Sequence, residues 1–108
     1  MSDIAATRER CRELEARLSR GPHWPELRAI YLDLSTVVGQ LQGAVAEHRR
    51  ARAEPSGNAP LEETLERLKS ELRVIGFNIR LSSEGALAVG LQTAVEDALA
   101  ILGLLEQH

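Results

Sequence analysis

The chain has 108 residues, which is enough for one domain with a modest core. Hydrophobic residues make up 44% and charged residues 27%, as is typical of a globular chain and not of a disordered one. With one Trp, one Tyr, one Phe and a net charge of −3, the chain lacks both the stacking residues and the positive charge of a general nucleic-acid binder.

The charge is divided unevenly along the chain. Residues 1–53 contain nine Arg against seven acidic residues, whereas residues 54–108 contain four basic against nine acidic residues. Such complementary halves can pair within one bundle or between subunits.

The single cysteine, Cys11, has no internal partner for a disulfide, and no basic-then-apolar leader opens the sequence. We therefore expect a cytoplasmic protein.

A first helix is predicted over about residues 3–20. Gly21-Pro22 should end it, because glycine accepts a left-handed conformation and proline cannot continue a helix. Cys11 falls in the apolar seam of this helix and is expected to be a small buried core residue. Trp24 follows at the corner before the next helix. It either covers the end of a bundle or is exposed as an anchor for a partner, since Trp is enriched at binding hot spots.

The longest predicted helix covers residues 25–52 and would be roughly 40 Å long. Pro25 suits its first turn, where a missing N–H costs nothing. One seam repeats every seven residues, at Leu27, Leu34, Leu41 and His48.

A second stripe of this helix lies about 150° from the leucine seam and consists mainly of small residues. Its members are Leu32, Ser35, Gly39, Gly43 and Ala46. Glycine inside a helix costs about 1 kcal/mol relative to alanine, so two of them four residues apart indicate close approach of another backbone. The alternative is that they are simply small exposed residues.

Residues 54–59 carry the strongest loop signal, Pro55-Ser56-Gly57-Asn58, and a third helix is predicted over about 60–81. Six aliphatic residues follow the spacing of a heptad seam: Leu61, Leu65, Leu68, Leu72, Ile75 and Ile79. The alternation of apolar residues from Ile75 to Leu81 would also suit a strand, but the unbroken heptad favours a helix.

A fourth helix is predicted over residues 84–106, after a turn with a serine cap at residues 82–85. The alternative is one continuous helix through this turn. The segment is apolar nearly all round, which favours burial on every side. Glu96 and Asp97 at its middle argue against a membrane span, so self-association or a partner groove is the better interpretation. The apolar residues off its main seam are Val89, Leu99, Ile101 and Leu104.

No catalytic, metal-binding or cofactor-binding constellation is recognisable. The three histidines have no ligand spacing, and phosphate loops and serine elbows are absent. Histidine phosphotransfer domains are helical bundles of similar size, but they usually place Lys and Gly soon after the histidine. This chain reads His48-Arg49-Arg50-Ala51, which departs from that pattern.

The sequence therefore predicts an all-α fold. We expect one domain over residues 1–108, an antiparallel bundle of four helices that self-associates. The alternative is a bundle of three helices with one long C-terminal helix.

The expected function is a non-enzymatic protein–protein interaction module, an adaptor or chaperone-like protein that dimerises or binds a partner's amphipathic helix. No cofactor, metal, nucleic acid or membrane is expected. The candidate interface residues are Trp24, Leu32, Ser35, Gly39, Gly43, Val89, Leu99, Ile101 and Leu104. The alternative function is a small-ligand or sensory bundle with a pocket among Trp24, Tyr31 and Phe77.

Overall fold

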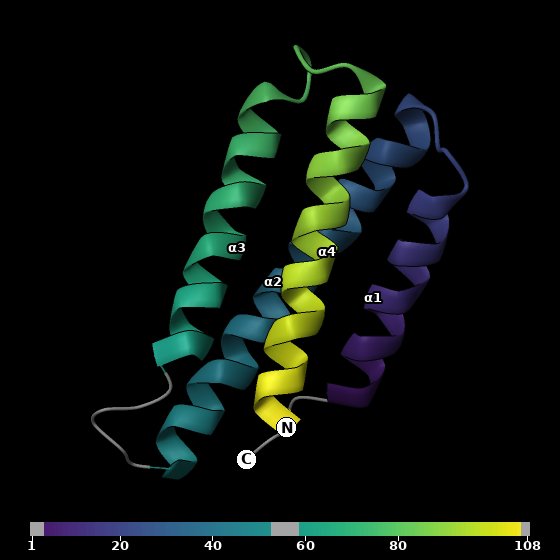
Figure 1. Cartoon of the computed structure of the whole chain (residues 1–108). Helices are drawn as coiled ribbons and strands as arrows, with labels where there is room; N and C mark the ends of the chain where they lie inside the picture. Colours follow the sequence, from purple (N-terminus) through teal and green to yellow (C-terminus); the bar gives the residue numbers. More distant parts are fainter. Residues whose placement is uncertain (1–3, 53–58, 107–108) are drawn as a thin grey trace.

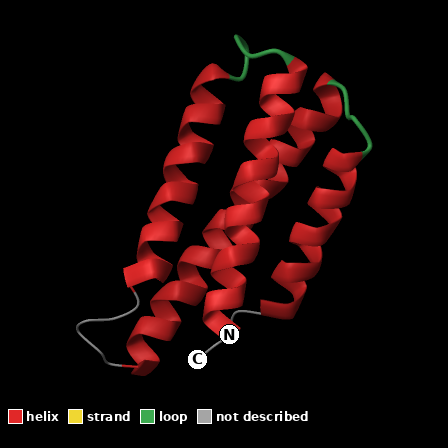
Figure 2. Ribbon diagram, in the orientation of Figure 1, coloured by secondary structure: helices red, strands yellow, loops and turns green. Residues whose placement is uncertain are grey.

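A computed structural model describes residues 4–52 and 59–106, which form four helices (Figure 1). These are α1 (Ile4–Ser19), α2 (Trp24–Arg52), α3 (Ala59–Asn78) and α4 (Glu84–Glu106). Within these ranges every regular element is a helix (Figure 2). The predicted all-α bundle of four helices is confirmed. The predicted loop at 54–59 lies outside the described residues, except for Ala59, which begins α3.

The helices run alternately up and down, so α2 and α4 point in the same direction (Figure 1). These two helices pack against each other across the bundle, and α1 and α3 lie on either side of the pair. The described parts of α1 and α3 do not contact each other, whereas α4 contacts all three other helices. The result is an elongated molecule with principal extents of 44 × 24 × 17 Å.

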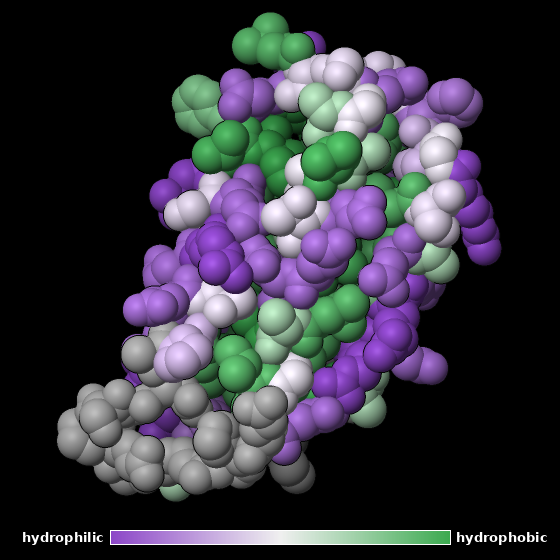
Figure 3. Space-filling model, in the orientation of Figure 1, coloured by the Kyte–Doolittle hydropathy of each residue, from purple (hydrophilic) through white to green (hydrophobic). Residues whose placement is uncertain are grey.

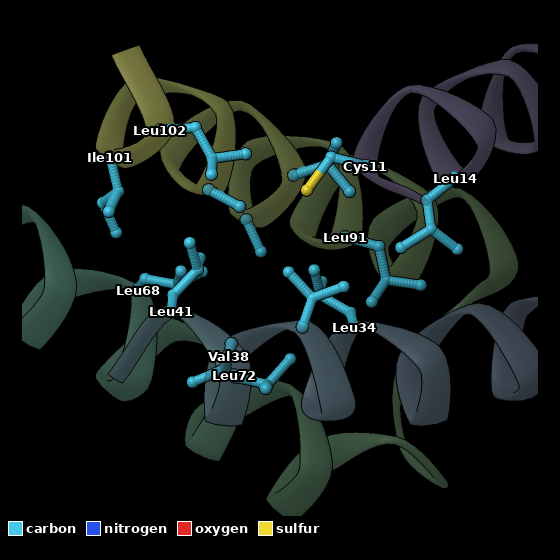
Figure 4. Close-up of a cluster of buried hydrophobic side chains, with 14 of the residues drawn as sticks. Cys11, Leu14, Leu34, Val38, Leu41, Leu68, Leu72, Leu91, Ile101 and Leu102 are labelled. Atoms are coloured by element: carbon cyan, nitrogen blue, oxygen red, sulfur yellow. The ribbon is translucent and has the colours of Figure 1, made fainter. Parts of the chain in front are cut away.

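The core is almost entirely aliphatic, because the chain has so few aromatic residues. All four helices contribute side chains that point toward one another, including Leu14, Leu34, Leu68 and Leu91 (Figure 4). Cys11 is fully buried among them, as predicted, and burial raises the pKa of its thiol to about 11. A thiol in this environment stays protonated and is inert toward electrophiles near neutral pH.

The position of α4 accounts for its unusually apolar sequence. Eight of its residues are buried, because α1, α2 and α3 all pack against it. A single chain of this size therefore covers α4 on several sides, while self-association stays a prediction. Within the described ranges α4 is also the one helix with the length and hydropathy of a membrane span, properties that core helices of soluble proteins share.

The turn between α3 and α4 shows why two helices form here, and not one long helix. The carbonyl of Asn78 accepts hydrogen bonds from the N–H groups of Leu81 and Ser82, each at 2.9 Å, which closes α3 three residues before its predicted end. The Ser83 hydroxyl then accepts a bond from the N–H of Ala86 at 3.1 Å and caps α4. The predicted turn with a serine cap is confirmed.

The other turn at this end of the bundle connects α1 to α2. Gly21 has a φ of +67°, the left-handed conformation expected of a glycine just after a helix. The first N–H of α2, that of Trp24, donates to Oε2 of Glu84 at 2.8 Å. Glu84 is the first residue of α4, so one carboxylate lies at the N-termini of two parallel helices, where negative charge is favoured.

Candidate functional site

The stripe predicted on α2 faces solvent along most of its length. Leu32 is 63% exposed, and Gly39 and Gly43 are exposed as well. A Cβ atom added at either glycine would meet no atom within 4 Å. Ser35 is half-buried, and its hydroxyl donates to the carbonyl of Tyr31 at 3.1 Å, a bond within the helix. The described chain itself therefore gives no packing reason for Gly39 and Gly43.

Two other helical glycines have a clear packing reason. A Cβ at Gly76 would collide with the hydroxyl of Tyr31, and a Cβ at Gly90 would lie 3.4 Å from Ile75. Both glycines sit where helices come close together, Gly76 against α2 and Gly90 against α3. They differ in this respect from the α2 glycines, whose surroundings are open.

The predicted interface residues of α4 are mostly part of the core. Ile101 is fully buried and is therefore not available to a partner, so its prediction as an interface residue is wrong. Leu99 and Leu104 are half-buried and pack against the core cluster. Val89 is the exception, because 66% of it is exposed. Trp24 is half-buried and also packs against the core, with the guanidinium of Arg28 5.9 Å from the centroid of its ring.

The largest exposed apolar residues lie on α3 and in the turn after it. Phe77 is 87% exposed, and Val74 and Leu81 are also mostly exposed. Hydrophobic side chains gather on the molecular surface over the upper parts of α3 and α4 (Figure 3). None of these three residues was among the predicted interface residues. The sequence did contain a signal, because Val74, Phe77 and Leu81 are spaced by three and four residues beside the heptad seam.

Of these three residues, Val74 lines a groove between α3 and α4 with a volume of about 420 Å³. We call it the α3–α4 groove, and most of the atoms exposed on its walls are apolar. Seven residues line it: Arg67, Ser70, Glu71, Val74, Ile75, Gly90 and Thr93. By helical periodicity Phe77 follows Ser70 along the outer edge on α3, and Val89 lies on the outer edge on α4. The groove is open to solvent on its outer side.

A charged network closes one end of the groove. Arg67 on α3 binds Asp97 on α4 with two hydrogen bonds, Nη2 to Oδ1 at 3.1 Å and Nε to Oδ2 at 3.3 Å. The same Nε lies 3.7 Å from Oε1 of Glu71. Oε2 of Glu71 is buried and receives no hydrogen bond from a donor, the one such side-chain atom in the described ranges.

The environment of Glu71 raises the pKa of its carboxyl group from 4.5 to about 7. Burial is the largest cause, and the hydrogen bond and charge of Asp97 add to it, whereas Arg67 acts in the opposite direction. Two ionised carboxylates are both acceptors, so Glu71 and Asp97 form a hydrogen bond only when one of them holds a proton. Glu71 therefore gains or loses its proton near physiological pH.

A second hollow lies between α2 and the turn after α3. It is lined by Arg28, Tyr31, Leu32, Ile79 and Arg80, and it shares no lining residue with the α3–α4 groove. The pocket predicted for the ligand-binding alternative combined Trp24, Tyr31 and Phe77. Neither Trp24 nor Phe77 lines this hollow, and Phe77 faces solvent.

The described residues contain no group of three or more His, Cys, Asp or Glu side chains placed to hold a metal ion. His48, the residue of the phosphotransfer hypothesis, is half-buried on the inner side of α2 near its C-terminal end. Comparison of the chain with protein-family models, with curated proteins and with solved structures found no match.

Proposed function

We propose that this chain is a cytoplasmic, non-enzymatic protein–protein interaction module, an adaptor or chaperone-like bundle whose α3–α4 groove receives an amphipathic helix. The observation that carries the proposal is the exposure of Val74, which lines the groove, together with that of Phe77 and Val89 on the helix faces beside it. The chain has a single phenylalanine, and it lies on the surface. Burying such a side chain is worth about 2 kcal/mol, so a partner that covers it gains affinity directly.

The dimensions of the groove suit a short helix. Its lining on α3 runs from Arg67 to Ile75, which corresponds to about 12 Å along the helix axis, and Phe77 lies two residues further on. An amphipathic helix engages a groove of this length with apolar residues at positions i, i+3 or i+4, and i+7. Two or three turns of the partner would then pack against α3 and α4 together.

Photocrosslinking in the source cells tests this function. Replacing Phe77 with p-benzoylphenylalanine keeps an aromatic side chain in the groove, and the same substitution at Leu32 labels an exposed site outside it. We expect the Phe77 probe to crosslink to one apolar helical segment of another protein that the Leu32 probe does not reach. Crosslinks only to a second copy of the chain, or equal labelling by both probes, would contradict the proposal.

Self-association through α2 is a second candidate activity, and the open surroundings of Gly39 and Gly43 favour it. Two α2 helices that cross at these glycines can approach more closely than helices with larger side chains. Light scattering of the purified protein should then give twice the chain mass of 11.9 kDa. Replacing both glycines with leucine should return the monomer mass. A monomeric wild-type protein would rule out this interface.

A further inference from the structure

The charge of the bundle is divided between its two halves. Residues 59–106, which form α3, α4 and their connection, contain eight acidic and four basic residues. Residues 4–52 contain nine basic and six acidic residues. Ion pairs between Arg8 and Glu106 and between Arg49 and Glu62 join the two halves. These two pairs leave the α3–α4 half with an excess of negative charge.

The same imbalance is present at the end of the α3–α4 groove. Two donors of Arg67 are directed at Asp97, whereas Glu71 lies farther from the guanidinium. Two carboxyl groups therefore share one cation. About a quarter of the Glu71 side chain is exposed, at the point where the groove lining changes from apolar to charged. Because Oε2 of Glu71 is buried, a cation supplied from outside the chain would approach this network at the exposed part of the Glu71 side chain.

We propose that the occupant of the α3–α4 groove is a basic amphipathic helix, whose apolar stripe covers Val74, Phe77 and Val89 and whose Lys or Arg pairs with Glu71. This inference rests on the proposed function and specifies its partner. Phe77 and Glu71 are six residues apart on α3, or about 9 Å along the axis. The partner's basic residue should therefore lie about six residues from the apolar residue that contacts Phe77.

A second copy of this chain fits the groove less well. Pairing two α3–α4 faces about a two-fold axis would bring two acidic surfaces together, which costs free energy. Pairing the α3–α4 face of one copy with the α1–α2 face of another matches charge, but it joins different surfaces and does not close into a dimer. A separate basic helix satisfies both the charge and the shape of the groove.

The pairing predicts that binding is linked to a proton. The charged groups that face Glu71 are Arg67 on its own helix and Asp97 on α4, and the neighbouring Ser70 and Thr93 are neutral. A Lys beside Glu71 favours its ionised form, so the complex forms with release of the proton that the free protein holds near pH 7. Affinity for a basic helix should therefore increase between pH 6 and pH 8.

Two synthetic helices test the inference. Both carry the same leucine stripe over about 18 residues, and their polar faces carry either Lys or Glu. Fluorescence anisotropy at about 0.15 M salt measures their affinity for the full chain and for three variants. Glu71→Gln removes the ionisable group, and Phe77→Ser removes the apolar anchor. Leu32→Ser removes a comparably exposed apolar side chain elsewhere and serves as the control.

We expect the Lys helix to bind roughly tenfold or more tightly than the Glu helix. Glu71→Gln should weaken the Lys helix roughly fivefold and abolish the dependence of its affinity on pH, while Leu32→Ser changes neither. If the two helices bind with equal affinity and neither binds Phe77→Ser, the proposal of a basic partner is refuted, but the groove stays a docking site. Absence of binding, or binding that survives Phe77→Ser, would overturn the docking site itself.

Discussion

Replacing Glu71 with glutamine should stabilise the fold at neutral and alkaline pH and leave it nearly unchanged in acid. The glutamine amide has the shape of a protonated carboxyl group and can donate to Asp97, as the protonated Glu71 does. The folded-state pKa of Glu71 is about 7, against an ordinary value of 4.5. Each pH unit between these values is worth about 1.4 kcal/mol, so the upper bound is about 3.5 kcal/mol.

The sign follows from which state holds the proton more tightly. Because the folded state has the higher pKa, ionisation of Glu71 destabilises the fold, and this penalty grows as the pH rises from about 4.5 to 7. Below that window the penalty is absent, and above it the penalty is complete. Since a quarter of the side chain is exposed, solvent screening reduces the effect, and we expect about 1–3 kcal/mol at pH 8.

Urea denaturation followed by circular dichroism at pH 5, 6, 7 and 8 measures this difference. Comparison of Glu71→Gln with the wild-type protein cancels the contributions of titrating groups that do not interact with Glu71. Glu66→Gln provides the control, because Glu66 is an exposed carboxylate of the same helix that pairs only with the neighbouring Lys69. Parallel pH profiles for Glu71→Gln and the wild-type protein would refute the assigned role of burial and Asp97.

Three further substitutions test the packing and the caps, with free energies of unfolding from urea denaturation as the measurement. Gly76→Ala should destabilise the fold by about 1 kcal/mol, because the added methyl group meets Tyr31. Gly39→Ala should stabilise it by about 0.5–1 kcal/mol, because the surroundings of Gly39 are open and alanine favours a helix. Equal effects of the two substitutions would contradict the difference in packing between the two glycines. Ser83→Ala should cost about 1 kcal/mol by removing the cap of α4, and no loss would mean that this cap is dispensable. Leu91→Ala should cost about 2–5 kcal/mol, since Leu91 is fully buried, and a smaller loss would place it outside the main core.

Much of the fold could be predicted from the sequence, because heptad spacing marks the buried face of a helix directly. Leu34 and Leu68 lie in predicted seams and are fully buried. Gly21-Pro22 and Ser83 are local signals, and they end or begin helices where the sequence placed them. These features depend on neighbouring residues alone, which explains why they can be predicted without tertiary information.

The number of neighbours of each helix could not be predicted in this way. Periodicity identifies the apolar faces of α4, but it does not reveal that three helices cover them, so Ile101 was assigned to a surface when it belongs to the core. The α3–α4 groove was missed for a related reason. Phe77 was assigned to a pocket inside the bundle, and the contact of Arg67 with Asp97 depends on how two helices are aligned.

The contact between Trp24 and Glu84 has a consequence for the axial alignment of the helices. Two parallel helices with leucine seams can slide by one heptad and still bury similar side chains, so aliphatic packing alone discriminates weakly between such alignments. A slide along the axis would separate the first N–H of α2 from the carboxylate that opens α4, and both groups would lose their partner. This polar contact near the end of the bundle therefore favours one register of α2 against α4.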